Sequence, residues 1–372
     1  MNMKLVTYEG LTFDDVLLLP GYTQVKREDI DVSTFLSSKV KLSIPLISSP
    51  MDTVTTSEMA IALGKLGGLG IIHRNMTVEK QVEEVVKVAK VIPIVGAAVG
   101  IGADLSSRTE ALAAAGATVI VVDSAHGFSK WVVEATKFIS QKYPDITLVS
   151  GSVATAEGAR ALIEAGADTL RVGMGPGSIC TTRVVAGMGV PQLTALFEAV
   201  SEASQKSIPV IADGGLRTSG DIVKALAAGA STIMSGSLFA GCFEAPGKVT
   251  TMGGKKYKTY RGMGSVSAMK EGSAARYGQN YHKGQERKLI AEGVEGRVPY
   301  KGSLENMVTQ LVGGLRTGMY YLGAQTLAEL WQKARFIKIS HASLQENAPH
   351  DILDINPPAG GQISKIQIKY KI

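Results

Sequence analysis

The chain has 372 residues, 45% of them hydrophobic, which is enough to bury one large core. Its formal charge of +6 suits an anionic ligand, but Lys and Arg are spread along the chain, which favours phosphorylated small molecules over nucleic acid. The longest apolar run, 111–122, is too short to span a bilayer, and the N-terminus lacks an apolar secretory core, so we expect a cytoplasmic protein. Two cysteines, Cys180 and Cys242, make a disulfide framework or a cysteine metal site implausible.

Short apolar, β-branched runs recur along the chain, and most are followed by an Ala-rich segment of helical period. This alternation is typical of βα units and a parallel sheet. Eight units favour a closed (β/α)8 TIM barrel over an open doubly wound sheet. The expected strands are 45–49, 70–72, 94–99, 119–123, 147–150, 169–172, 210–212 and 232–234.

Three of the expected helices end at a glycine, in the position of a left-handed cap. These helices are 106–115, 155–165 and 219–228, ending at Gly116, Gly166 and Gly229. Each glycine leads directly into the next strand. The repeated unit is therefore helix, glycine and strand, although no sequence repeat of fixed period is present.

After the eighth strand, the pattern gives way to a polar stretch from about 243 to 301 that is too long for an ordinary connection. We interpret it as a mobile active-site flap. Residues 1–358 then form a single catalytic barrel domain, with a glycine-rich loop at about 173–190. The basic tail, 359–372, forms an edge strand or is disordered.

The glycine-rich loop carries Cys180 after three glycines and a proline, with hydroxyl side chains and Arg183 beside it. Such a loop offers backbone N–H groups to an anion and carbonyls to a cation, and Arg183 favours a thiolate. We interpret Cys180 as a nucleophile, against the alternative of a small buried hydrophobe. Cys242 lies in an apolar stretch and is assigned to packing.

Two further glycine loops follow strands seven and eight, where barrels commonly bind phosphate. They contain Asp213 with Gly214 and Gly215, and Gly236 with Ser237. Asp213 would repel a phosphate and suits ribose hydroxyls instead. A tight turn alone is the competing explanation for the paired glycines.

No glycine fingerprint of a Rossmann dinucleotide site, P-loop or HExxH motif is present, so a dinucleotide would have to use the barrel mouth and the flap. In the flap, Arg276, Tyr277 and Glu292 are able to move protons. Arginine is a poor base at its usual pKa, and residue chemistry alone assigns Arg276 to the solvated surface.

Ten ordered segments together resemble the inosine monophosphate dehydrogenase and guanosine monophosphate reductase family, over about residues 8–355. They are LTFDDVLLLP (11–20), SSPMDTVT (48–55), GGLGIIHRNM (67–76), VGAAVG (95–100), DSAHG (123–127), GPGSICTTRVVAGMGVPQLTA (175–195), ADGGLR (212–217), YRGMGSVSAM (260–269), ARYGQ (275–279) and EGVEGRVPYKG (292–302).

The resemblance implies a two-stage oxidation of inosine monophosphate (IMP) to xanthosine monophosphate (XMP), a step of guanine nucleotide biosynthesis. Cys180 would add to purine C2, hydride would leave for NAD+, and a covalent thioimidate would remain. The flap would then replace NADH, and Arg276 with Tyr277 would activate water. Thr182 and Glu292 resemble an alternative proton relay. A base role for Arg276 requires a shifted pKa in a closed site.

The resemblance also implies a set of ligand contacts, residue by residue. Contacts to IMP would be Ser49, Met51, Arg171, Ser178, Asp213, Gly215, Gly236, Ser237, Tyr260, Gly262, Met263, Gly264 and Glu292. Asp213 would hold the ribose, while Ser178, Gly215, Gly236, Ser237 and Tyr260 would hold the phosphate. Contacts to NAD would be Asp123, Ser124, Ser152, Gly173 and Gly175.

A potassium site and a homotetramer are implied in the same way. Carbonyls of Gly175, Gly177 and Cys180 resemble half of the family's potassium site. The other half would be Glu346, Asn347 and Ala348 of a neighbouring subunit, which is why a homotetramer is expected.

Two departures from the family pattern stand out. Ser152 follows Gly151 where the family often has Asn, which affects one contact on the nicotinamide side. Longer members insert a tandem CBS regulatory domain after the second βα unit, and about 88–95 leaves no room for it. Nucleotide control through that domain should therefore be absent.

Two other functions compete with the oxidation. Guanosine monophosphate (GMP) reductase shares the barrel, the cysteine and the Thr–Glu relay, but deaminates with NADPH; the pair Arg276 and Tyr277 argues against it. A non-enzymatic phosphate- or nucleic-acid-binding protein would fit the net charge and the basic tail, but would gain nothing from a cysteine on its ligand loop.

Overall fold

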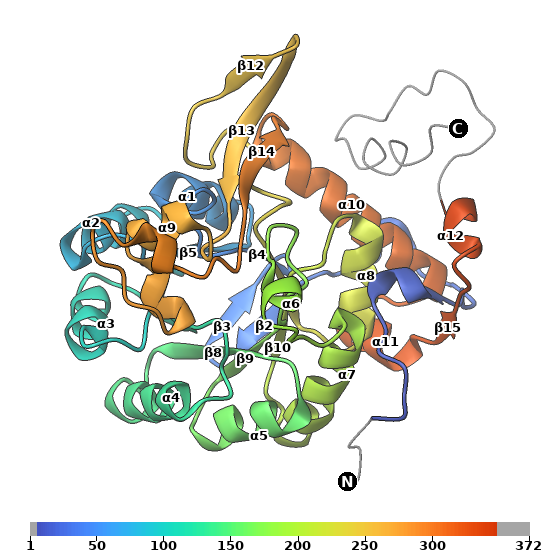
Figure 1. Ribbon diagram of the computed structural model, residues 1–372. Helices are drawn as coiled ribbons and strands as arrows, with labels where there is room; N and C mark the ends of the chain where they lie inside the picture. Colours follow the sequence, from blue (N-terminus) through green and yellow to red (C-terminus); the bar gives the residue numbers. More distant parts are fainter. Residues whose placement is uncertain (1–5, 348–372) are drawn as a thin grey trace, which may run out of the picture.

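A closed parallel barrel of eight strands forms the centre of the computed structural model, which describes residues 6–347 (Figure 1). The strands are β4 (Leu46–Ser48), β5 (Leu69–Ile72), β6 (Gly96–Val99), β7 (Val119–Asp123), β8 (Thr147–Val153), β9 (Thr169–Val172), β10 (Val210–Asp213) and β11 (Thr232–Ser235). They follow one another in chain order, and β11 closes on β4 through Met234 and Ile47. The prediction of a (β/α)8 barrel is confirmed, with all eight strands where the sequence indicated them.

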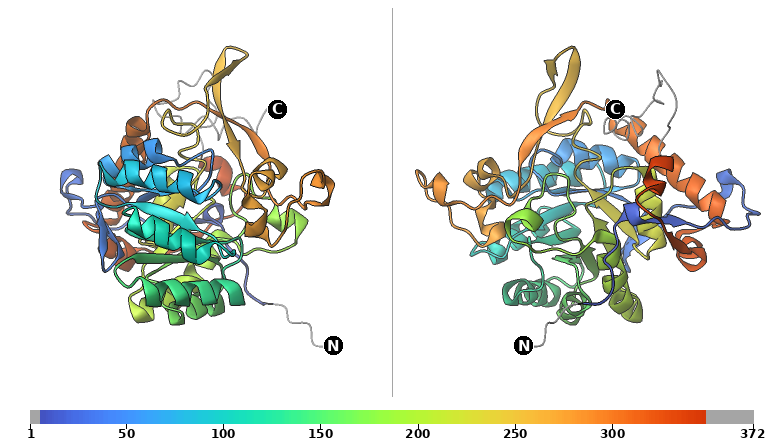
Figure 2. Two further views of the ribbon diagram at one scale, coloured as in Figure 1. Left: turned by 90° about the vertical axis from the view of Figure 1, so that its left-hand side faces the viewer. Right: turned by 45° about the vertical axis from the view of Figure 1, so that its right-hand side comes forward.

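Helices surround the barrel (Figures 1 and 2), whose strands are almost entirely buried. These helices are α1 (Ser57–Lys65), α2 (Val78–Ala89), α3 (Leu105–Ala114), α4 (Lys130–Lys142), α5 (Ala156–Glu164), α7 (Gln192–Ala203), α8 (Ser219–Ala227) and α10 (Leu304–Leu322). A short helix, α6 (Thr182–Val185), lies on the glycine-rich loop and buries none of its residues. As predicted, Gly116, Gly166 and Gly229 follow their helices at φ values of +100°, +95° and +98°. Only glycine enters this region without strain, so these residues redirect the chain into the next strand.

A β-hairpin closes the amino-terminal end of the barrel. Its strands are β2 (Thr34–Ser37) and β3 (Val40–Leu42). Leu36, Val40 and Leu42 pack against inward-facing barrel residues. The Ser37 hydroxyl bonds that of Thr147 at the start of β8 at 2.7 Å. With that end plugged, the opposite end is left to hold a site.

The remaining N- and C-terminal elements pack together on one side of the barrel. Strand β1 (Val16–Leu18) pairs antiparallel with β15 (Phe336–Lys338), although they lie about 320 residues apart in the chain. The short helices of these terminal segments are η1 (Phe13–Asp15), η2 (Arg27–Asp29), α11 (Leu327–Lys333) and α12 (Ser343–Glu346), whereas η3 (Ser204–Lys206) continues α7. The basic tail, 359–372, lies outside the described residues.

The long insertion after β11 lies between this strand and α10, as predicted, but much of it is regular structure. It contains the three-stranded antiparallel sheet β12 (Thr250–Met252), β13 (Lys255–Arg261) and β14 (Glu295–Pro299), with α9 (Val266–Lys270), η4 (Ser273–Tyr277) and η5 (Glu286–Lys288). The β12–β13 hairpin projects well beyond the barrel (Figures 1 and 2). We call residues 243–301 the flap.

Candidate active site

A cavity of about 930 Å³, open to solvent, lies at the carboxyl ends of the barrel strands beneath the flap. It brings together every predicted catalytic and substrate residue: Ser49, Met51, Arg171, Ser178, Cys180, Thr182, Asp213, Gly215, Gly236, Ser237, Tyr260, Gly262, Met263, Gly264, Arg276, Tyr277 and Glu292. Of the predicted cofactor contacts, it includes Ser124, Ser152, Gly173 and Gly175. Segments separated by more than 200 residues in sequence thus form one wall.

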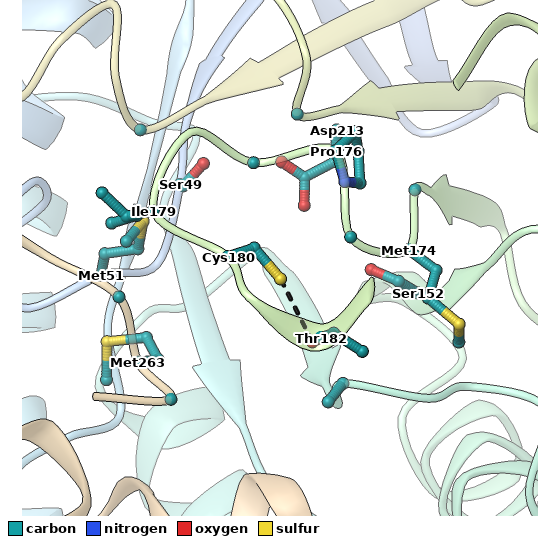
Figure 3. Close-up of a pocket in the computed structure, with 18 of the residues that line it drawn as sticks. Ser49, Met51, Ser152, Met174, Pro176, Ile179, Cys180, Thr182, Asp213 and Met263 are labelled. Atoms are coloured by element: carbon teal, nitrogen blue, oxygen red, sulfur yellow. Dashed lines mark hydrogen bonds between the residues drawn. The ribbon is translucent and has the colours of Figure 1, made fainter. Parts of the chain in front are cut away.

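The thiol of Cys180 lies at the centre of this cavity, between Met51 and Met263 on one side and Asp213 and Ser152 on the other (Figure 3). It donates a hydrogen bond of 3.2 Å to the Thr182 hydroxyl. A polar partner at this distance gives the thiol proton a path, as a nucleophile requires.

The backbone of the cysteine loop is bound to the flap. Val294 N–H donates to the carbonyl of Ile179 and Thr181 N–H donates to that of Glu292, both at 3.0 Å. Glu292 N–H in turn donates to Gly264 at 3.0 Å. Segments 179–181, 292–294 and 262–264 therefore form a small ladder, which fixes the nucleophile relative to the flap. We call it the loop–flap ladder.

Arg183, which the sequence predicts to favour the thiolate, also braces the loop in this structure. Its guanidinium donates to the carbonyls of Val190 at 2.6 Å and Met174 at 3.3 Å. The two ends of the loop are thereby held together.

Asp213 ends β10 and lies beside Arg171, whose Nε is 3.1 Å from its Oδ2. Burial raises the pKa of this carboxyl, and Arg171 opposes the rise. An acceptor held in this way suits a ribose hydroxyl, as the sequence predicted.

Bare backbone and hydroxyl groups line the neighbouring wall. Ser178, Gly215, Gly236 and Ser237 lie there with the Tyr260 phenol, which approaches Met51 Sδ at 3.9 Å. A side chain at Gly236 would collide with this phenol, because an added Cβ would lie 2.6 Å from its oxygen. The glycine therefore permits the close approach that a backbone phosphate site needs.

Asp123 lies behind the cavity and does not line it. Its side chain is 3% exposed, and Arg171 Nη1 donates to it at 2.7 Å. Arg276 of the flap contacts the second carboxylate oxygen, from which Arg74 Nε lies 3.8 Å away. Three guanidinium groups thus share one carboxylate. Arg74 is a part of this cluster that the sequence did not indicate, because the other members lie in segments distant in sequence.

Arg276 and Tyr277 of the flap line the cavity, and the Arg276 side chain is only 13% exposed, contrary to the solvated surface position that residue chemistry alone indicated for it. Burial lowers the pKa of Arg276, and the nearby Arg74 adds to this effect. The Asp123 carboxylate in contact with it favours the charged form by simple Coulomb attraction. Burial also raises the pKa of Tyr277. A lowered pKa of Arg276 is the direction that a role as a base requires.

Arg261 anchors the flap to the barrel. Its Nη2 lies 2.7 Å from Asp52 Oδ2 and its Nε 3.1 Å from Oδ1. Asn75 also donates to Asp52, at 2.7 Å. Arg261 separates Tyr260 from Gly262, so the anchor acts directly on two cavity residues. The sequence analysis did not single out this pair, because no spacing rule links residues 209 positions apart.

The predicted potassium ligands do not meet within one chain. The loop places Gly175, Gly177 and Cys180 at the cavity, whereas Glu346 and Asn347, at and after the end of α12, do not line it. Ala348 lies outside the described residues. Among residues 6–347, no cluster of three His, Cys, Asp or Glu side chains could hold a metal ion, and no helix is long and apolar enough to cross a membrane.

Comparison with known proteins identifies the family. Residues 10–350 match the model of the IMP dehydrogenase / GMP reductase domain. The chain is 45% identical to an inosine-5'-monophosphate dehydrogenase of Borreliella burgdorferi, covering 94% of this chain and 99% of that protein. It is 46% identical to one of Cryptosporidium parvum and 42% identical to one of Aquifex aeolicus, in both cases over 92% of this chain and 96% of the relative. With the cysteine loop and flap in one cavity, these matches establish that the chain belongs to the IMP dehydrogenase / GMP reductase family.

Proposed function

We propose that this protein is an oxidoreductase that converts IMP to XMP with NAD+ as oxidant. One observation carries the proposal: the nucleophile Cys180 shares its cavity with Arg276 and Tyr277 of the flap. A thiol alone accounts for formation of a covalent adduct. A second, buried proton-transfer group is needed to hydrolyse it.

In the first half-reaction, the sulfur of Cys180 forms a bond to C2 of the purine. Thr182 accepts the thiol hydrogen bond, and with Glu292 it offers a route for the proton. NAD+, when bound, accepts the hydride that leaves C2. The product is a thioimidate between the purine and Cys180.

In the second half-reaction, Arg276 takes a proton from water, which then adds to C2. The carbon–sulfur bond breaks and releases XMP and the thiol. Burial supports this role because it brings the pKa of Arg276 toward the range of a base. Tyr277, whose ring lies against Gly264, accompanies it in the same cavity.

The residues around Asp123 suit a cofactor that occupies the same place as the flap at a different stage of the reaction. Asp123 is the predicted partner of the NAD ribose, and Arg276 contacts the same carboxylate. A hydroxyl could use this carboxylate fully only after Arg276 withdraws. Ser124 and Ser152 line the cavity nearby, and Ser152 accepts a bond of 3.0 Å from Arg171 Nε.

Potassium and a homotetramer remain part of the proposal. Carbonyl oxygens such as those of Gly175, Gly177 and Cys180 are the donors that K+ accepts in proteins. Three carbonyls of one loop do not complete its coordination, which is why a neighbouring subunit would supply Glu346, Asn347 and Ala348. We also propose a cytoplasmic location.

A single catalytic domain without a CBS insert also belongs to the proposal. Helix α2 ends at Ala89 and β6 begins at Gly96. The alignment with the Aquifex aeolicus relative has 473 positions although it covers only 92% of the 372 residues of this chain, so the relative has a long stretch without a counterpart here. Control by nucleotides through such an insert is therefore not expected.

The test is the product formed from IMP, NAD+ and K+. We expect NADH by absorbance and XMP by chromatography, and replacement of Cys180 by Ala should abolish turnover while IMP still binds. Ammonia release from GMP with NADPH, and no NADH from IMP, would identify a GMP reductase instead. Nucleotide binding with neither reaction would indicate a binding protein.

A further inference from the structure

Two lysines at the base of the flap donate to backbone carbonyls of the turn that follows β11. Lys301 Nζ lies 3.0 Å from the carbonyl oxygen of Ser237 and 2.9 Å from that of Leu238. Lys258 Nζ bonds the carbonyls of Cys242 and Phe243, each at 3.1 Å, and also contacts that of Ala245. Neither lysine lines the cavity. They differ in the carbonyls that they bind: Lys301 binds those of Ser237 and Leu238, and Lys258 binds those farther along the chain.

Lys301 fixes the two peptide units directly after Ser237. In the first unit, the Ser237 carbonyl accepts a hydrogen bond from Lys301, and the Leu238 N–H donates to the Ser235 hydroxyl at 3.3 Å. In the second unit, the Leu238 carbonyl accepts from Lys301, and the Phe239 N–H donates to the Gly236 carbonyl at 3.1 Å. Because a peptide unit is planar, a bond at each end leaves it little freedom to rotate.

The position of Lys301 is itself set by the flap. It directly follows Tyr300 after the end of β14, and its N–H donates to the carbonyl of Gly241 at 2.8 Å. Its stem passes over Gly241, where an added Cβ would lie 3.0 Å from Lys301 Cγ and 2.3 Å from the carbonyl oxygen of Pro299. Strand β14 of the flap thus leads to a position from which the Lys301 ammonium group reaches the Gly236–Ser237 turn.

We propose that Lys301 is a positioning residue for the 5'-phosphate of the substrate. It holds the peptide units next to Ser237 in the conformation that receives the phosphate, and its charge attracts the dianion. Together with Tyr260, which pairs with Gly296 of β14, it links the flap to phosphate binding. The inference rests on the proposed function, since it assumes a nucleotide phosphate at Gly236 and Ser237.

The test compares IMP with inosine, which lacks the phosphate, by calorimetric titration of the full-length protein. Lys301→Met retains the stem and removes the charged donor. We expect its Kd for IMP to rise about tenfold, which is about 1.4 kcal/mol, because the charged donor is lost while the peptide units keep their other bonds. The Kd for inosine should change less than about twofold, because inosine has no phosphate to bind at the turn that Lys301 holds. Lys301→Arg, which can still donate to both carbonyls, should recover most of the affinity for IMP.

Lys258→Met is the matched control, because it removes a carbonyl-binding ammonium from the same turn farther from Ser237. It should lower the melting temperature and leave the ratio of the two Kd values unchanged. Lys256→Met, at an exposed position of the same strand, controls for net charge in a variant that retains every buried contact.

Two results would overturn the role of Lys301. One is an equal loss of affinity for IMP and inosine, and the other is no loss for either. If the unmodified protein bound IMP no better than inosine, the phosphate site itself would be wrong, and the role of Lys301 with it.

Discussion

Replacing Asp52 by Asn should loosen the flap where it joins the barrel. The carboxylate of Asp52 is 8% exposed and bonds both Nε and Nη2 of Arg261, whose side chain is 14% exposed. Breaking a fully buried ion pair by removal of one partner costs about 3–5 kcal/mol. Asn retains one acceptor, and Arg261 keeps its contact with Glu271, so we expect about 2 kcal/mol here.

This loss should appear in catalysis, because Arg261 separates Tyr260 from Gly262 at the cavity wall. A loss of about 2 kcal/mol in transition-state binding lowers kcat/KM for IMP roughly 30-fold. Steady-state kinetics measures it, and amide hydrogen exchange at 262–264 should become faster in the same variant.

Glu271→Gln provides the control, since it removes the other carboxylate that contacts Arg261. The Glu271 side chain is 60% exposed, and exposed ion pairs contribute about 0–1 kcal/mol. Its kcat/KM should therefore fall less than about fivefold. If Asp52→Asn stayed within twofold of the unmodified protein, or if Glu271→Gln were the more damaging change, the anchor would be misassigned.

Other predictions concern hydrolysis, pH and the monovalent cation. Arg276→Gln should slow the second half-reaction much more than the first, so rapid mixing should show a burst of NADH followed by slow turnover; equal slowing of both phases would contradict the base role. Burial lowers the pKa of His73 to about 4, and its Nδ1 accepts the N–H of Asn75 at 3.1 Å, which requires the neutral ring. Since the unfolded histidine has a pKa of about 6.5, stability present above pH 6.5 is lost as the pH falls toward 4, by about 2 kcal/mol between pH 8 and pH 5. Urea unfolding of His73→Asn should lack this loss, and an unchanged pH dependence would refute the assignment. Replacing K+ by Li+ should lower kcat, measured by NADH formation at constant ionic strength, whereas equal rates would remove the potassium site from the proposal.

The barrel could be predicted because each strand and helix carries its own local signal. Buried parallel strands are continuous apolar runs, and a glycine ends several helices at a fixed place. Loops at the carboxyl ends of such strands must converge, so Asp213 and Gly236 were correctly expected in one cavity with Cys180.

The flap was predicted as an insertion but not as a sheet. Strand β13 is exposed along most of its length, with only Lys258 and Tyr260 buried. Such a strand has no apolar alternation to detect, and its polar composition resembles a loop. Pairing of β1 with β15 was missed for a related reason, since nothing in a three-residue strand specifies a partner so distant in sequence.

Ionic contacts were the least predictable part of the site. Arg276 was assigned to the surface although the folded flap turns it into the cavity, because charge and residue type say nothing about which side chains desolvate it. The convergence of Arg74, Arg171 and Arg276 on Asp123 joins four separate segments: the loop after β5, strands β9 and β7, and η4 of the flap. Only the family resemblance supplied a role for Arg276 from the sequence.

The loop–flap ladder has a consequence for protein engineering. Its bonds join backbone groups of 179–181, 292–294 and 262–264, so the three segments fit by length and register rather than by side-chain identity. A flap transplanted from another family member should dock on this loop when its spacing to the ladder is kept, even if its sequence differs widely. Insertion of a single residue at 293, by contrast, would shift the register and break the ladder.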